Sequence, residues 1–378
     1  MSYQSVDKLQ NALSENIFHY AKDKKKASGR ALGTIVEIIT YYLIKSWNLN
    51  SSTSIERGLE EYGNPEISHN VEYSLHPILN KYEIFLPKTG KSLTANSLLK
   101  ELEKQEIELD KFTKKNNTLL SIHDIIRNAC TIGISDHSYL IATLDSETSK
   151  IYKIKIIEQS HKAYSMFECK RVGVEEGNKK GPQTIEKAKQ GAYVARTISS
   201  LQKIRIDTGE LYGILYKDKK TYTKPYTDLL NELIFSKDNE LLEKFILTIG
   251  IVSNHGNWFT SENQNKELKV LAQSYDWLIF LTDNGLSEFI ELLILKPSKE
   301  YLPIKEAFIA SYTATKKRNR FTKVQMDKKA DELLQKFFIE NKKKIENWFN
   351  IISPAGKTIA ELKIELNELK NKNWKKIL

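Results

Sequence analysis

Two side chains near the middle of the chain have the types and the spacing to do chemistry together. Glu168 and Lys170 belong to the stretch HKAYSMFECKRVG, at the end of an apolar and aromatic segment that predicts a strand. Alternation along a strand places both on one face, about 6–7 Å apart, with Phe167 and Cys169 on the other. A carboxylate in this position can hold a hard divalent cation while the ammonium reaches a water or a phosphate oxygen.

The spacing alone does not single out this pair. The pattern acid-any-Lys occurs eight times in the chain. The other copies lie in charge runs or in segments with helical periodicity, where solvated surface charge is the simpler interpretation. The copy at Glu168 and Lys170 is the one that ends an apolar strand. A surface ion pair is the alternative interpretation of this copy too.

A second acid is expected close to Glu168, because one carboxylate alone binds Mg²⁺ weakly. A β-meander of three strands is predicted, with the sequences SYLIATLD, IYKIKIIEQ and YSMFECK. Asp136 precedes the first of these strands and Asp145 ends it. We favour Asp136 as the partner of Glu168, and Asp145 is the alternative.

A buried helix is predicted upstream, at residues 31–46, because apolar side chains recur there at helical spacing. They cover most of the circumference of the helix, which is typical of a buried one. Glu37 is the only charged residue in its segment ALGTIVEIITYYLI. A buried charge without a purpose is costly. We therefore expect either a role for Glu37 in a site or a salt bridge to a nearby Lys or Arg.

The composition narrows the class of protein. The chain has 378 residues, and 58 Lys and Arg against 48 Asp and Glu give a net charge of +10. This charge favours a polyanionic partner, because each cation set against a phosphate releases counterion. Cys130 and Cys169 provide neither a disulfide framework nor a CxxC metal knuckle. No stretch predicts a membrane span or a secretory signal, so we expect a cytoplasmic protein.

The rest of the chain predicts a mixture of helices and strands. Pro182 is expected to open a helix after a glycine-punctuated loop, and residues 275–283 to form a strand. Other expectations are a basic turn at KDKKKASGR, irregular structure at 49–92 and helix at 93–130. After about 327 we expect highly charged helices that are solvated or face a partner.

The arrangement resembles the catalytic core of the PD-(D/E)xK nucleases. The shared features are an SD dipeptide before a strand, a hairpin, and a strand that ends in ECK. The longer stretch FECKRVGVEEGNKKGPQTIEKAKQGAYVARTISSLQ is similar to part of a type II restriction endonuclease. The resemblance covers residues 134–204 together with the upstream helix, and Ser135 stands where the family pattern has proline.

The resemblance implies an α/β fold of mixed α+β type, with a restriction-endonuclease-like core in which helices flank a central mixed sheet. It divides the chain into a nuclease domain at 1–326, with a helical N-terminal part and DNA-recognition insertions, and a charged helical region at 327–378. The implied function is that of a type II restriction endonuclease, which hydrolyses double-stranded DNA at a specific sequence and leaves 5′-phosphate and 3′-hydroxyl ends. A repair or recombination nuclease and a non-catalytic nucleic-acid-binding protein are the alternatives.

The same resemblance assigns roles to individual residues. Asp136 and Glu168 would hold Mg²⁺, with the backbone carbonyl of Cys169 as a third ligand. Lys170 would position or deprotonate the attacking water. Glu37 would reach the metal through a water molecule.

Double-stranded DNA is the expected partner, and a homodimer would bring two active sites to the two strands. A cognate methyltransferase would protect host DNA without forming a stable complex. Candidate DNA contacts come from basic clusters, from the helix after the catalytic strand and from the segment SNHGNWF, although ordinary surface or phosphate contact is the alternative for each. These candidates are Lys179, Lys180, Lys187, Gln190, Asn254, His255, Asn257, Lys316, Lys317, Arg318 and Arg320.

Overall fold

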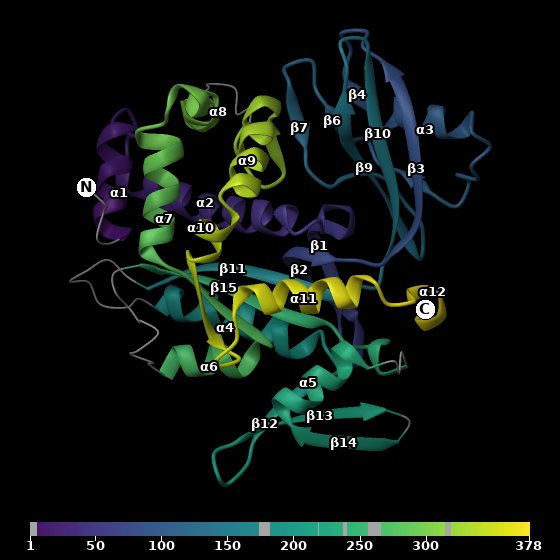
Figure 1. Ribbon diagram of the computed structural model, residues 1–378, viewed down its shortest axis with the longest axis vertical. Coiled ribbons are helices and arrows are strands. Elements are labelled where there is room, and N and C mark those ends of the chain that lie inside the picture. The colour runs from purple at the N-terminus through teal and green to yellow at the C-terminus, as the bar shows by residue number, and fades with distance from the viewer. Residues whose placement is uncertain (1–5, 174–181, 218, 237–239, 256–265, 314–318) are drawn as a thin grey trace.

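The computed structural model describes residues 6–173, 182–217, 219–236, 240–255, 266–313 and 319–378. Within these residues a mixed sheet of six strands lies at the centre of the molecule, in the order β1-β2-β11-β15-β16-β18 (Figure 1). Its strands are β1 (Thr53–Glu61), β2 (Asn64–Leu75), β11 (Ser165–Gly173), β15 (Leu247–His255), β16 (Trp277–Leu281) and β18 (Phe349–Ser353). The predicted mixed α/β class, with a central sheet flanked by helices, is confirmed.

The middle of this sheet is parallel and its margins are antiparallel. Strand β11 runs parallel to β15, and β15 runs parallel to β16. Strand β2 pairs antiparallel with both β1 and β11, and β18 pairs antiparallel with β16. Strand β11, which carries Glu168 and Lys170, is therefore an interior strand with neighbours on both sides.

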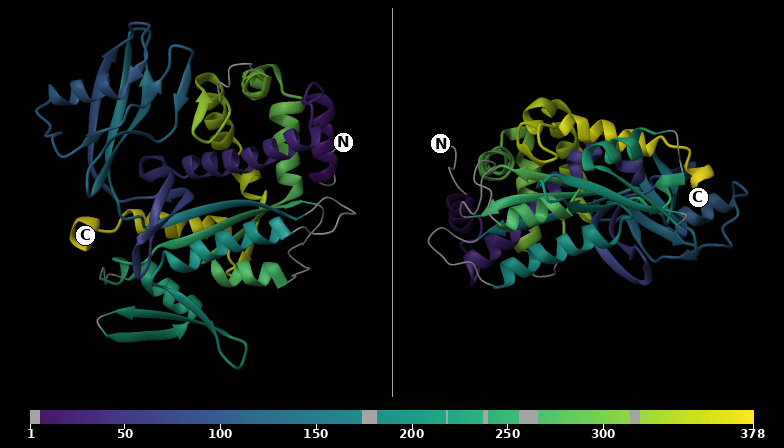
Figure 2. Two further views of the ribbon diagram at one scale, coloured as in Figure 1. Left: turned by 180° about the vertical axis from the view of Figure 1, so that it is seen from behind. Right: turned by 90° about the horizontal axis from the view of Figure 1, so that it is seen from below.

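Helices cover both faces of the central sheet (Figures 1 and 2). On one face α4 (Pro182–Thr197) packs on β11 and β15, and α6 (Lys266–Ser274) packs on α4 and β16. On the other face α2 (Lys24–Ser46) packs on β11, and α1 (Val6–Asn16) packs on α2. The remaining helices are α3 (Ala95–Glu103), α5 (Tyr226–Phe235), α7 (Asp283–Ile290), α8 (Leu302–Thr313), α9 (Lys328–Glu340), α10 (Lys342–Glu346), α11 (Ile359–Lys370) and α12 (Trp374–Ile377).

Three smaller sheets surround this core in the described residues. One has the order β3-β10-β9-β8-β5, with β3 (Ile78–Pro87), β10 (Ile151–Ser160), β9 (Ser138–Glu147), β8 (Cys130–Ile134) and β5 (Thr113–Lys114). A second has the order β17-β7-β6-β4, with β17 (Gln325–Asp327), β7 (Ile125–Arg127), β6 (Thr118–Leu120) and β4 (Leu93–Thr94). The third is β12-β13-β14, with β12 (Gln202–Arg205), β13 (Leu211–Lys217) and β14 (Lys220–Pro225), and it projects from the core together with α5 (Figure 1).

The predicted meander is only half correct. Strands β9 and β10 form the expected antiparallel pair around the polar turn. The third strand, β11, instead leaves this sheet and pairs with β2 and β15. The physical reason is burial: Met166 and Phe167 point to opposite faces of β11 and are both fully buried. Only a sheet covered on both faces can bury them both.

The expectations for the N-terminal third are wrong in several places. Helix α2 begins at Lys24 rather than after a basic turn, and the Asp23 carboxylate caps it by accepting a 2.9 Å hydrogen bond from the amide of Lys26. Residues 49–92 contain β1, β2 and β3, and their prolines lie near strand ends or between strands, where the missing N–H does no harm. Residues 93–130 contain the helix α3 and short strands joined by turns and loops, rather than helix throughout.

The C-terminal segment is also more buried than expected. Helices α9 and α11 bury one face each, including Leu334, Phe338 and Leu366, so they are not solvated helices. Strand β18 from the same segment is one of the two outer strands of the central sheet. The predictions of a helix starting at Pro182 and a strand within 275–283 are confirmed by α4 and β16. None of the described helices has the length and apolar character that crossing a bilayer requires.

Candidate active site

Glu168 and Lys170 project from the middle of the central sheet. Glu168 is 4% exposed, and the Lys170 ammonium lies 3.0 Å from its Oε2 atom. Cys169, between them, faces the other way: its thiol donates to the Thr40 hydroxyl of α2, with a sulfur–oxygen distance of 3.3 Å. The predicted alternation is therefore confirmed, with the Glu168 and Lys170 side chains on the face that α4 covers.

The second acid beside Lys170 is Glu72 on β2. Strands β2 and β11 pair from Leu75–Ser165 to Tyr73–Phe167, and the next register position would set Glu72 opposite Glu168. The pairing stops there, which leaves both carboxylates at the point where the strands separate. Lys170 Nζ lies 3.8 Å from Glu72 Oε1, so one ammonium contacts a carboxylate on each strand.

A second lysine gathers further carboxylates around Glu72. Lys323 Nζ contacts Glu72 Oε2, and it lies 3.2 Å from Glu56 Oε1 and 3.5 Å from Glu37 Oε2. Glu37 comes from α2, Glu56 from β1 and Glu72 from β2. Glu37 thus lies in the same cluster as Glu72. Its salt bridge to Lys323 is one of the two roles that the sequence left open for it.

The four glutamates outnumber the two lysines of the cluster. The pKa of Glu37 is raised to about 7, because burial and the nearby Glu72 together outweigh the opposing effect of Lys323. Burial also raises the pKa of Glu168, against the opposing effect of Lys170. Protons are therefore held more tightly than usual on Glu37 and Glu168, and a cation that enters the cluster favours the ionised forms of these two groups.

The two lysines stay protonated at neutral pH. Burial by itself lowers the pKa of Lys170, but its attraction to Glu168 and Glu72 outweighs burial and raises that pKa above its ordinary value. The pKa of Lys323 is raised for the same reason, by Glu37, Glu72 and Glu56 against burial. Both side chains therefore act as fixed positive charges in the cluster.

Glu56 has an unusual backbone for a residue within a strand. Its φ angle is +52°, in the left-handed region that non-glycine residues seldom adopt. Its neighbours Ile55 and Arg57 keep their pairing with β2, so the strain is local to Glu56. Strain of about 1–3 kcal/mol persists only where the surroundings impose it, and such residues cluster at functional sites.

Tyr275, at the end of α6, forms a wall next to Glu168. Its ring packs on Gly250, the residue of β15 that pairs with Glu168. A Cβ atom at position 250 would lie 2.8 Å from the ring, so only glycine fits there. Tyr275 is 2% exposed, and burial and the nearby Glu168 raise the pKa of its hydroxyl well above the ordinary value.

The predicted second ligand lies elsewhere. Asp136 is an exposed residue between β8 and β9, on the five-stranded sheet. The amide of His161, before β11 begins, donates to the carbonyl of His137 at 2.8 Å, so Asp136 is near the connection into β11 rather than beside Glu168. Asp145 pairs with Lys155 at 2.6 Å and with Lys153 at 3.4 Å. Neither aspartate is among the described partners of Lys170 or Lys323.

The predicted DNA contacts are mostly beyond what the structure describes. Gln190 is exposed on α4. Arg320 donates from Nη2 to the carbonyl of His123 at 2.8 Å, and it lies 3.9 Å from Asp327, so its guanidinium already has partners within the chain. Outside the described residues lie Lys179, Lys180, Asn257, Lys316, Lys317 and Arg318, and outside the described side chains lie those of Lys187, Asn254 and His255.

The donor set matches the needs of Mg²⁺ in type. Glu72 and Glu168 supply carboxylate oxygens, the hard ligands that Mg²⁺ takes, and it often uses only one or two carboxylates together with water and substrate phosphate. In the described part of the chain, no group of three or more His, Cys, Asp or Glu side chains is arranged to enclose a metal ion. An open site with two carboxylates fits these observations, whereas a closed structural metal site does not.

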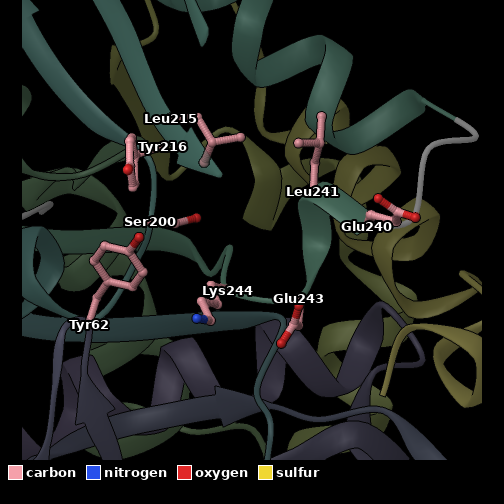
Figure 3. A pocket seen from close by; sticks show the side chains of 8 residues that line it. All are labelled: Tyr62, Ser200, Leu215, Tyr216, Glu240, Leu241, Glu243 and Lys244. Carbon is pink, nitrogen blue, oxygen red and sulfur yellow. The ribbon is translucent and has the colours of Figure 1, made fainter. Parts of the chain in front are cut away.

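A separate cavity of about 250 Å³ lies between the β1–β2 turn and the β12–β14 sheet (Figure 3). Tyr62 and Tyr216 line it, together with Ser200 and Lys244. Its lining includes none of the carboxylates or lysines of the cluster. The cluster is therefore not part of this cavity.

Sequence reasoning missed Glu56, Glu72 and Lys323. For Glu72 a signal was present: apolar residues alternate in VEYSL, and YGNP has the composition of a hairpin turn. Gly63 occupies that turn with φ +81°, as a tight turn requires. For Lys323 the local sequence carries no signal, because its carboxylate partners lie far away in the chain.

No protein-family model matches the chain, and neither a curated protein nor a solved structure gives a match.

Proposed function

We propose that the protein is a Mg²⁺-dependent DNA endonuclease of the restriction type, with Glu72, Glu168 and Lys170 as its catalytic residues. The observation that carries the proposal is the position of Lys170, whose ammonium contacts a carboxylate on each of two adjacent strands where those strands separate. A surface ion pair does not account for this geometry, because Glu168 is almost fully buried in an interior strand.

Glu72 and Glu168 would hold Mg²⁺, and Glu72 takes the place that the sequence assigned to Asp136. The metal, when bound, would polarise the scissile phosphate and stabilise the negative charge that develops on it. The carbonyl of Cys169 lies between the two side chains on β11, and we keep it as a proposed third ligand. Burial raises the pKa of Glu168 despite the nearby Lys170, and a divalent cation beside it would favour the ionised form that serves as a ligand.

Lys170 acts as a cation rather than as a general base. Its pKa is raised by Glu168 and Glu72, so its amine carries a proton at neutral pH and cannot remove one from water. The ammonium donates hydrogen bonds, orients the attacking water and offsets charge on the phosphate. Of the two roles that the resemblance gave Lys170, positioning is the one that its electrostatics favour.

Duplex DNA is the proposed substrate, since the net charge of +10 favours a polyanion. We propose a homodimer, in which each copy cuts one strand, and host protection by a cognate methyltransferase without a stable complex. A repair or recombination nuclease would use the same three residues on branched or nicked DNA.

The test is a cleavage reaction with a choice of substrates. Purified protein is incubated with phage-length duplex DNA and with branched and nicked DNA, each with Mg²⁺ or with EDTA. The proposal predicts discrete fragments from the duplex in Mg²⁺ alone. Cutting confined to branched or nicked DNA would favour the repair nuclease, and binding without cleavage of any substrate would leave a non-catalytic DNA-binding protein.

A further inference from the structure

Lys323 brings a positive charge into the cluster from a distant part of the chain. Its side chain is 9% exposed, and its ammonium contacts carboxylates from α2, β1 and β2. An isolated buried charge would be unstable, and these three carboxylates offset the cost of its burial. The ammonium therefore occupies the space between Glu37, Glu56 and Glu72, and another cation that bound there would be repelled by it.

The turn that carries Lys323 is held firmly by backbone contacts. The Thr322 amide donates to the Gln325 carbonyl at 2.8 Å, which closes the turn around Lys323. Asn128, itself buried, donates from Nδ2 to the Lys323 carbonyl at 3.0 Å and from its amide to the Val324 carbonyl at 2.9 Å. The backbone from which the Lys323 side chain reaches the cluster is therefore fixed.

The two oxygens of Glu72 divide the cluster into two halves. Oε1 faces Lys170, which also contacts Glu168. Oε2 contacts Lys323, which also contacts Glu37 and Glu56. Each half therefore contains one ammonium, which faces two carboxylates at Lys170 and three at Lys323.

We propose that Lys323 is a positioning residue that acts as the built-in second cation of the active site, so that the enzyme binds one divalent ion per chain instead of two. Its ammonium fills the place between Glu37, Glu56 and Glu72 and balances their charge in the metal-free protein. Without it, four glutamates would face Lys170 alone, and their mutual repulsion would favour the entry of a second divalent ion. This inference rests on the proposed function for the identity of the first ion.

The test counts bound Mn²⁺ per chain by electron paramagnetic resonance, without DNA, in the wild type and in Lys323→Met. We expect the variant to bind one more ion than the wild type. Lys323→Arg, which keeps the charge, should keep the wild-type count. The matched control is Lys328→Met, because Lys328 lies shortly after the same turn but pairs with Glu147, outside the cluster, at 2.7 Å. An unchanged count in Lys323→Met would overturn the proposal.

Thermal unfolding provides a second readout that does not depend on catalysis. Metal-free Lys323→Met should melt at a lower temperature than the wild type, and Mn²⁺ should raise its melting temperature more than it raises that of the wild type. A purely structural lysine would give the loss without the extra metal response, and this result would overturn the proposal. If Lys323→Met does not fold, Lys323→Gln, which keeps a hydrogen-bond donor, takes its place in both measurements.

The test of Lys323 can fail or succeed independently of the test of the proposed nuclease function. The wild-type ion count and the cleavage reaction test the nuclease, whereas the difference between variant and wild type tests Lys323. If the wild type binds no Mn²⁺ and cuts no DNA, the proposed function fails. An added ion in Lys323→Met would then still show that Lys323 fills a cation place between Glu37, Glu56 and Glu72, and no added ion would contradict it.

Discussion

The ammonium of Lys170 lies 3.0 Å from the carboxylate of Glu168, two residues earlier on the same interior strand, and also reaches Glu72 on the neighbouring strand. Two carboxylates and a lysine thus meet where β2 and β11 stop pairing. The protein holds this arrangement between α2 and α4, with Tyr275 as a wall on the α4 side.

Lys170→Met tests the lysine of this arrangement. If the ammonium orients water and offsets charge on the phosphate, the cleavage rate at saturating DNA should fall at least about 100-fold. DNA binding should change little, because a single cation among many contributes modestly to affinity. The measurements are single-turnover cleavage and a binding isotherm.

The matched control for Lys170 is Lys155→Met. Lys155 also lies on a strand and pairs with a carboxylate, Asp145, at 2.6 Å, but in another sheet. Its replacement should leave the cleavage rate unchanged. Equal losses in the two variants would mean that ion pairs on strands matter for folding, and the assignment of Lys170 as catalytic would be wrong.

Glu72→Gln and Asp136→Asn separate the acid that the structure places in the cluster from the acid that the sequence favoured. Each change removes one negative charge and keeps the shape of the side chain. Glu72→Gln should abolish Mg²⁺-dependent cleavage, whereas Asp136→Asn, at an exposed position, should retain it. Full activity in Glu72→Gln together with a dead Asp136→Asn would restore the original assignment.

Gly250→Ala tests the close packing of Tyr275 behind Glu168. The added methyl group would lie 2.8 Å from a buried ring, so the free energy of unfolding should fall by about 1–3 kcal/mol. Gly33→Ala on α2 is the control, because an added Cβ there meets nothing within 4 Å and alanine favours the helix, so about 0.5–1 kcal/mol should be gained. Urea unfolding measures both, and a loss of similar size at Gly33 would refute the steric explanation.

The buried His76 should make stability fall in acid. Its Nδ1 donates to the Ser160 carbonyl at 2.8 Å and its Nε2 accepts from the Ser74 hydroxyl at 2.7 Å, which fixes the neutral ring. Burial, with a smaller effect of nearby Arg57, lowers the pKa of His76 to about 3. The unfolded chain takes up the proton near its ordinary pKa of about 6.5, so stability present above that pH is lost as the pH falls toward 3.

The measurement is urea unfolding at several pH values between about 7 and 4. His76 should contribute a loss of up to about 1.4 kcal/mol per pH unit, and His76→Gln should remove that part of the slope. The exposed His123, changed to Gln, is the control and should leave the slope as it is. A wild-type slope that His76→Gln does not reduce would show that other groups cause the acid sensitivity.

The sequence predicted the parts of the site that depend on local pattern. Glu168 and Lys170 could be found because apolar alternation marks β11 over only a few residues. Glu72 was missed because prolines in 49–92 masked a hairpin, and the meander then placed β11 in the wrong sheet. Lys323 could not be found, because it is separated from Glu72 by 251 positions and only tertiary packing brings the two together.

In the fold as well, elements with a local sequence signal could be predicted, and features set by tertiary packing could not. The helix at Pro182 and the strand in 275–283 have local signals, and both are found. The burial of α9 and α11 is set by contacts with the rest of the core, so their charged composition gave the wrong expectation of solvated helices. Glu37 is an intermediate case, because its place on a buried helix was predicted but its partner Lys323 was not.

The most direct test of the central claim is Mg²⁺-started cleavage of phage-length DNA by the wild type and by Glu168→Gln, side by side. The glutamine keeps the size of the buried side chain and removes the charge that would bind the metal, so DNA binding should persist in both proteins. We predict discrete fragments from the wild type after Mg²⁺ is added and none from Glu168→Gln. Equal cleavage by the two proteins, or no cleavage by the wild type, would contradict the account.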